Sequence, residues 1–191
     1  PPLTAGQTYA SGGLVARIDL HKGTFCKIKI SGFLIRDIDR DAVRDVVRRD
    51  YDKQAALFAA AAGSRQALRM CCPDAFLEQE HDDTMTPARF AAMNGHHECL
   101  RLCPPETLLM QDYDSERTPA HLAAEGRHAA CLRVCSHESL RVQDYGGRAP
   151  AHIAAQLGDV DCLLMCPLDT FFLQDEEGFT PTVLIILGQH A

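Results

Sequence analysis

Cysteine and histidine are the residues of this sequence best suited to carry chemistry. The chain of 191 residues contains nine of each. Six cysteines form three pairs with a spacing of four residues, and a histidine or an aspartate stands three residues before each pair. Thiolate and imidazole groups bind zinc, and a cysteine beside a histidine can act as a nucleophile. The three groups are His96/Cys99/Cys103, His128/Cys131/Cys135 and Asp159/Cys162/Cys166.

The spacing within each group argues against a metal site. Two residues seven apart on a helix are separated by about 10 Å of rise, so one zinc ion cannot contact all three side chains of a group. A pair of cysteines could supply two ligands only if a neighbouring segment supplied the others. Free cysteine also serves as a small buried hydrophobic residue. We therefore expect structural cysteines, no metal and no cofactor, with a thiol-based metal or redox sensor as a weaker alternative.

Motifs of catalysis are missing from the sequence. There is no Gly-x-Ser-x-Gly, no Gly-x-Gly-x-x-Gly and no Walker loop, and Ser11-Gly12-Gly13 is too short for a phosphate cradle. A general acid–base pair needs no sequence motif, because geometry defines it. We expect no intrinsic enzyme activity; if the chain takes part in catalysis, the catalytic domain would lie elsewhere in a longer parent chain.

Composition and charge limit the classes of partner. The chain has 19 basic and 26 acidic residues, a net charge of −7, which argues against general nucleic-acid binding. Its longest aliphatic run, Val183–Leu187, is far shorter than the ~20 residues of a membrane helix. The odd number of cysteines within apolar stretches indicates reduced thiols. These features predict a cytoplasmic protein, monomeric by itself, that binds neither nucleic acid nor membranes.

Residues 1–50 differ in pattern from the rest. Apolar and polar residues alternate over 14–20 and again over 26–30, on both sides of the turn-like segment 21–24, which predicts a β-hairpin. Asp41 then precedes an apolar stripe with helical spacing, which predicts a helix with an acidic N-cap. We expect this segment to cap the first unit of the following domain. The stripe consists of Ala42, Val43, Val46 and Val47.

Residues 51–191 contain an internal repeat. Ala56, Ala88, Ala120, Ala151 and Thr182 are separated by 32, 32, 31 and 31 residues. Similar pentapeptides begin at the first four positions, including Ala-His-Leu-Ala-Ala and Ala-His-Ile-Ala-Ala, and proline precedes the last four. A second apolar stretch follows in each of the first four units. The predicted units lie near residues 51–78, 79–110, 111–142, 143–173 and 174–191, the last being partial.

This pattern resembles the ankyrin repeat, which has a period of about 33 residues and a Thr-Pro-Leu-His-x-Ala signature. The resemblance covers about three-quarters of the chain and implies an all-α solenoid of stacked helix pairs. It also implies that His121 and His152 form hydrogen bonds within and between repeats. Leu57, Arg89 and Val183 stand at the same position in the other units. The last unit is either a half-repeat cap or the cut edge of a longer chain.

The most direct reading of this architecture is recognition of a partner protein. Tyrosine and arginine, which are enriched at binding hot spots, stand in the turns before the first helices. In the family these turns and the exposed first-helix positions form the concave recognition face. Because arginine pairs well with carboxylates, we expect a partner with an acidic or mixed polar segment. The predicted contact residues are His81, Met85, Met93, Asn94, Tyr113, Arg117, Glu125, Tyr145, Arg148, Gln156, Leu157, Glu176 and Phe179.

One further alternative concerns the whole protein. The segment could be a targeting or regulatory part of a larger enzyme or of a secreted, host-directed effector, in which case it would act in the host cytosol. The sequence opens with Pro1-Pro2 rather than Met and has no basic-then-apolar signal segment. These observations leave a longer parent chain open.

Overall fold

The computed structural model divides the chain into two compact units, Pro1–Asp52 and Lys53–Ala191. In the first unit it describes the backbone of residues 8–11, 14–20, 25–30 and 33–39. In the second it describes residues 53–71, 73–77 and 85–188. The helix predicted after Asp41 lies outside these residues.

Four strands form one antiparallel sheet in the first unit: β1 (Thr8–Ser11), β2 (Leu14–Leu20), β3 (Phe25–Ile30) and β4 (Phe33–Asp39). Their order in the sheet is the order in the chain, β1-β2-β3-β4. Ile18 of β2 is paired with Ile28 of β3, and the register between β3 and β4 shifts between Cys26 and Ile28. Strands β2 and β3 cover the residues for which the sequence predicts a hairpin, and β1 and β4 extend the sheet on either side.

The described residues of the second unit form helices and no strand. Residues 53–61 are helical and are followed by the short helix α2 and the 3-10 helix η1. The remaining elements come in the order first helix, second helix, 3-10 helix, except that no 3-10 helix follows the second helix at Ala129–Leu132. Their bounds are α2 (Arg65–Leu68), η1 (Pro73–Phe76), α3 (Pro87–Met93), α4 (His97–Leu100), η2 (Pro105–Leu108), α5 (Pro119–Glu125), α6 (Ala129–Leu132), α7 (Pro150–Gln156), α8 (Val160–Met165), η3 (Leu168–Phe172) and α9 (Pro181–Leu187).

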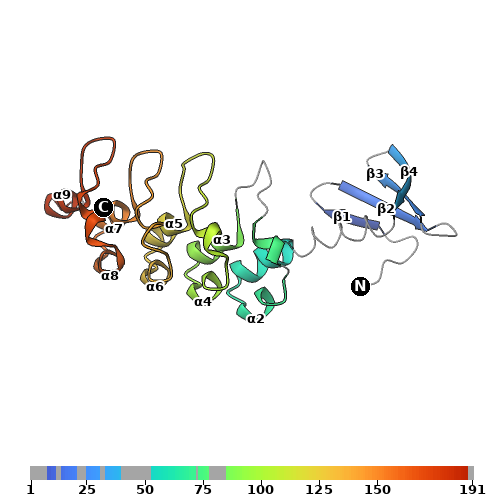
Figure 1. Ribbon diagram of the computed structural model, residues 1–191, viewed down its shortest axis with the longest axis horizontal. Helices are drawn as coiled ribbons and strands as arrows, with labels where there is room; N and C mark the ends of the chain where they lie inside the picture. Colours follow the sequence, from blue (N-terminus) through green and yellow to red (C-terminus); the bar gives the residue numbers. More distant parts are fainter. Residues whose placement is uncertain are drawn as a thin grey trace. The chain divides into compact units, whose positions relative to one another are not determined.

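The helices of the second unit stack in two rows (Figure 1). The first helices α3, α5, α7 and α9 pack in series, and so do the second helices α2, α4, α6 and α8. Each of α3, α5 and α7 also packs against the second helix that follows it. Loops that precede α5, α7 and α9 project on one side, and the second helices lie on the opposite side (Figure 1).

The sequence sets where the first helices begin and end. Each of α3, α5, α7 and α9 begins at a proline, which has no backbone N–H to leave unpaired at the first helical position. Residues with positive φ follow α3 and α7, namely Gly95 (φ 76°) and Gly158 (φ 64°). After α5 the glycine stands one position early, so Arg127 adopts the left-handed conformation with φ 60° instead.

Alanine pairs allow the first helices to approach closely. Ala91 and Ala92 in α3, their counterparts in α5 and α7, and six cysteines of the second helices and following turns are buried. In α9 the corresponding pair is Ile185 and Ile186, and both are exposed. Within the described residues, no helix is both long and apolar enough to cross a membrane.

Candidate partner-binding surface

Three turns carry six of the thirteen residues that the sequence predicts as contacts. They cover residues 111–117, 143–148 and 174–179, precede α5, α7 and α9, and are called the turn tips below. Each begins with a Gln-Asp pair whose aspartate closes the turn. The backbone N–H of Asp144 donates to the carbonyl of Arg148 (2.9 Å), and the same closure joins Asp112 to Arg117 and Asp175 to Phe179. An aspartate suits this place because its carboxylate accepts N–H groups of the residues that follow it.

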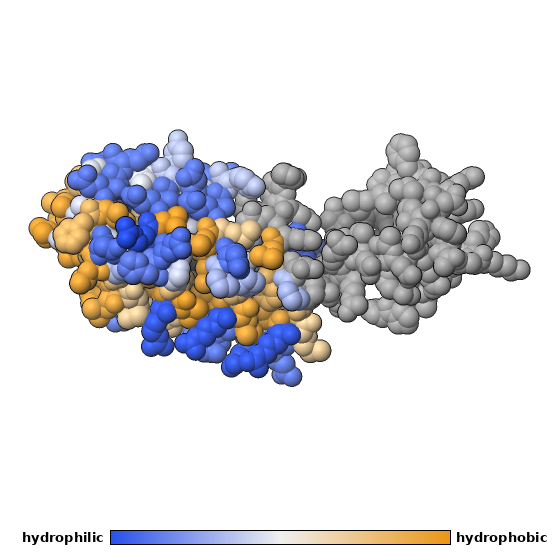
Figure 2. All heavy atoms as spheres, viewed as in Figure 1, coloured by the Kyte–Doolittle hydropathy of each residue, from blue (hydrophilic) through white to orange (hydrophobic). Residues whose placement is uncertain are grey.

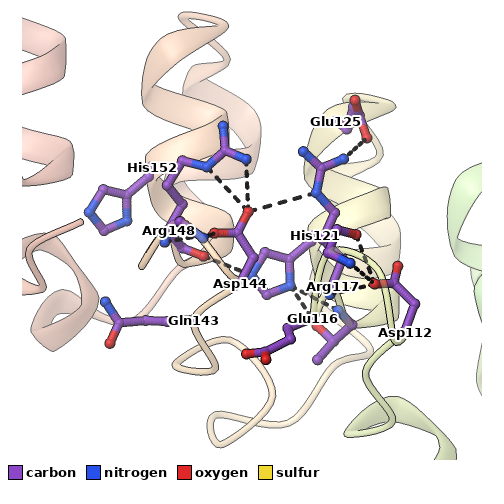
Figure 3. Close-up of polar contacts among 12 residues, drawn as sticks. Asp112, Glu116, Arg117, His121, Glu125, Gln143, Asp144, Arg148 and His152 are labelled. Atoms are coloured by element: carbon purple, nitrogen blue, oxygen red, sulfur yellow. Dashed lines mark hydrogen bonds and ion pairs between the residues drawn. The ribbon is translucent and has the colours of Figure 1, made fainter. Parts of the chain in front are cut away.

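Asp144 is the most heavily bonded of these aspartates (Figure 3). Its Oδ1 accepts the backbone N–H groups of Gly146 (3.0 Å) and Arg148 (2.9 Å), while Oδ2 accepts Nε (3.2 Å) and Nη2 (2.9 Å) of the Arg148 guanidinium. Arg117 of the preceding turn tip adds an ion pair at 3.7 Å. Burial alone would raise the pKa of Asp144, but the hydrogen bonds from Arg148 and its charge hold it below its ordinary value.

A buried arginine supports the neighbouring turn tip. Asp112 accepts the N–H (2.7 Å) and hydroxyl (2.8 Å) of Ser115 through Oδ1, and the guanidinium of Arg89 through Oδ2. Arg89 also donates to the carbonyl of Arg117. Burial would raise the pKa of Asp112, but the hydrogen bonds from Ser115, Arg117 and Arg89 lower it. Arg89 therefore links α3 to the turn tip of the next unit.

Histidines make the same link in the next two units. His121 Nδ1 accepts the N–H of Thr118 (3.1 Å), so its Nε2–H donates to the carbonyl of Arg148 (2.9 Å). His152 likewise contacts the carbonyl of Phe179 at 3.2 Å. Burial lowers the pKa of His121 to about 4 and also lowers that of His152. Both side chains are neutral at pH 7, and each connects its first helix to the following turn tip by a hydrogen bond.

Adjacent turn tips are joined by hydrogen bonds. The side-chain amide of Gln111 donates to the carbonyl of Gln143 (3.2 Å), and that of Gln143 donates to the carbonyl of Gln174 (2.9 Å). The backbone N–H of Tyr145 donates to Ser115, and the N–H of Glu176 donates to Gly146, both at 3.0 Å. The tips are thus held to one another as well as to the helices behind them.

Tyr113 and Tyr145 are the large exposed side chains of the turn tips. Each follows the aspartate that closes its turn, and their exposed fractions are 69% and 71%. No ion pair or hydrogen bond of either side chain is formed with another described residue. Two aromatic rings therefore extend into solvent from a backbone that is fixed on both sides.

The structure gives Arg117 and Arg148 partners inside the chain. Arg148 grips the carboxylate of Asp144 with two nitrogens, and Arg117 contacts Glu125 at 3.1 Å as well as Asp144. A carboxylate at this distance offsets the charge of the guanidinium and so lowers its attraction for a second carboxylate. The acidic or mixed polar partner segment stays a prediction, with weaker support from these two arginines.

The remaining predicted contact residues are spread along the first-helix row. Met93 and Asn94 are exposed at the end of α3, where Asn94 donates to the carbonyl of Phe90 (2.9 Å). Glu125 and Glu176 are exposed. His81 lies outside the described residues. Intermediate exposure is found for Met85, Gln156, Leu157 and Phe179.

The residues that build the turn tips are not among the contact residues predicted from the sequence. Asp112 and Asp144 are buried, and Gln111 and Gln143 bridge successive turns. Their signal is in the sequence, because Gln-Asp recurs at residues 111–112, 143–144 and 174–175. The contact residues are predicted from the large side chains of the turns, and these aspartates and glutamines are not among them.

The cysteines have the environment of core residues. The six cysteines of the three pairs are free thiols and buried, whereas Cys71 has intermediate exposure. Burial raises the pKa of Cys131 to about 11 and that of Cys103, Cys135 and Cys166 to about 12, and it also raises those of Cys99 and Cys162. Such thiols are protonated at neutral pH and are poor nucleophiles. Among the residues described, no group of three or more His, Cys, Asp or Glu could hold a metal ion.

Comparison with known proteins adds no relative. No protein-family model matches the chain, and no curated protein sequence is significantly similar to it.

Proposed function

We propose that the second unit is an ankyrin-type recognition module that binds a partner protein through its turn tips. The observation that carries the proposal is the exposure of Tyr113 and Tyr145 at equivalent positions of two turns that are bonded to each other. Tyrosine combines a large contact area with few rotatable bonds, and a fixed backbone loses little entropy on binding.

The charge of the turn tips favours a basic partner segment. Asp114, Glu116, Glu176 and Glu177 are exposed, and none of them forms an ion pair with a described residue. The arginines of these turns are already neutralised by Asp144 and Glu125. Tyrosine rings also attract arginine and lysine through cation–π contacts. The turn tips thus combine free carboxylates with two aromatic rings.

Removal of the two tyrosines tests the proposal. A photo-crosslinking amino acid at position 113 or 145 identifies the partner in an extract of the source cells, and its affinity is then measured by calorimetry. We expect Tyr113→Ala with Tyr145→Ala to weaken binding by about 30-fold or more. Phe172→Ala removes an equally exposed ring from η3 and serves as the matched control. Equal losses in both variants would contradict the proposal.

A further inference from the structure

One column of side chains on the opposite side of the second unit has no role in the turn tips. The column consists of the arginines that directly follow the second helices of three successive sequence repeats. They are Arg69 after α2, Arg101 after α4 and Arg133 after α6. All three are exposed. We call these three residues the arginine ladder.

The backbone gives the ladder one orientation. Arg69 has φ −66° and ψ −19°, Arg101 has φ −63° and ψ −24°, and Arg133 has φ −63° and ψ −23°. Because α2 packs on α4 and α4 on α6, three side chains that leave the same kind of helix end in the same way follow one line. Figure 2 shows hydrophilic residues gathered beneath these helices in the view of Figure 1.

Little inside the chain neutralises the ladder. Arg101 has Glu98 at 3.7 Å, but both side chains are exposed and solvent screens the pair. Neither Arg69 nor Arg133 forms an ion pair with a described residue. Arg65 of α2 adds a further exposed guanidinium, 3.4 Å from the same Glu98. The ladder is therefore a local column of positive charge although the chain carries a net charge of −7.

In the fourth sequence repeat an apolar residue stands where the ladder has arginine. Leu164 of α8 takes the place of the arginine and is 72% exposed. Val160 and Leu168 are also exposed in the same unit. A favourable contact of each arginine with the negative end of its helix would explain the first three residues alone. It does not explain why an apolar side chain continues the column in α8.

We propose that the arginine ladder and Leu164 bind an extended acidic peptide that carries an apolar residue at one end. Neighbouring packed helices lie about 8–10 Å apart. A peptide in the extended polyproline II conformation advances about 9 Å in three residues and completes one turn, so every third side chain points to the same face. Carboxylates at every third position therefore match successive arginines, and an apolar residue three positions further reaches Leu164. A nucleic-acid backbone offers no aliphatic side chain to meet Leu164, whereas a peptide does.

Titration of a labelled synthetic peptide tests this inference. The probe has three glutamates at every third position, a leucine three residues after the last, and serine or glycine elsewhere; its reversed order is tested too. By fluorescence polarisation with the full chain, we expect saturable binding that weakens about five-fold with Arg133→Gln and at least ten-fold with Arg101→Gln added. Arg127→Gln removes the same charge from the α5–α6 connection, and we expect it to change affinity less than two-fold.

The leucine contact is tested by a double-mutant cycle. We expect replacement of the peptide's leucine by serine to lower its affinity for the unchanged chain about five-fold. The same replacement should change its affinity for the Leu164→Ser variant very little, because the leucine contact is already lost there. Circular dichroism checks that the exposed substitutions leave the fold unchanged. No saturable binding in either peptide direction, equal effects of Arg133→Gln and Arg127→Gln, or tighter binding of a single-stranded oligouridylate would overturn the proposal. We expect the variant with Tyr113→Ala and Tyr145→Ala to bind the peptide as the unchanged chain does, because the turn tips and the second helices lie on opposite sides of the second unit (Figure 1).

Discussion

Asp144→Asn tests whether the buried carboxylate holds the turn tips together. Its side chain is 1% exposed and its Oδ2 faces the guanidinium of Arg148 and, at 3.7 Å, that of Arg117. Asparagine keeps an oxygen for the N–H groups of Gly146 and Arg148 but turns an NH₂ group toward two cations. Hydrogen bonds to charged groups contribute about 1.5–3 kcal/mol each. Because Arg148 retains some contact with solvent, we expect a loss of about 2–3 kcal/mol in the free energy of unfolding.

Asp175→Asn is the matched control. Asp175 closes its turn in the same way, through the N–H groups of Glu177 (3.1 Å) and Phe179 (2.8 Å), but no arginine in the described part of the chain pairs with it. We expect this substitution to cost less than about 1 kcal/mol. Urea unfolding followed by circular dichroism at pH 7 measures both. If the two variants lose the same free energy of unfolding within about 0.5 kcal/mol, the contacts of Asp144 with Arg148 and Arg117 do not stabilise the turn tips.

The effect of Asp144→Asn on stability should also depend on pH. The pKa of Asp144 is lowered in the folded chain. Its contribution is therefore complete above the unfolded value of about 3.9 and is lost as pH falls through the folded pKa. The stability gap between the unchanged chain and Asp144→Asn should close below about pH 3.9, whereas a gap that persists in acid would point to a packing defect.

Three further substitutions test other parts of the structure. His121, with a folded pKa of about 4, must be neutral when buried, so stability should fall by about 3 kcal/mol from pH 6.5 to 4, and urea midpoints for His121→Gln should show a shallower fall. Glu116 has φ 53° where the next turn has Gly147, so Glu116→Gly should raise the thermal midpoint by an amount equivalent to about 1 kcal/mol; a lower midpoint would contradict the strain. Joint replacement of Cys131 by Val and Cys135 by Leu should cost under about 1.5 kcal/mol and keep the circular dichroism spectrum, and loss of folding would show that the thiols do more than fill the core.

The sequence by itself determined the period, the helix starts and the buried positions of the second unit. Proline fixes its own φ and needs no helical N–H partner, so α3, α5, α7 and α9 each begin at the proline that recurs in the sequence. Paired alanines and the cysteines of the second helices are buried because small apolar side chains at helical spacing let neighbouring helices approach. These are local properties, and local pattern reveals them. The sequence also placed Tyr113 and Tyr145 at turns, where both are exposed.

Only the tertiary structure decided how the polar side chains are used. Arg117 and Arg148 look available in the sequence, but Asp144 binds both because one turn tip stacks on the next. Arg89 contacts Asp112, 23 residues away, and takes the structural place that histidine has in the next two units. Such pairs depend on which units lie side by side and on water being excluded between them. A charge that sequence reasoning assigns to a partner can be neutralised within the chain, because stacking brings a buried carboxylate within reach.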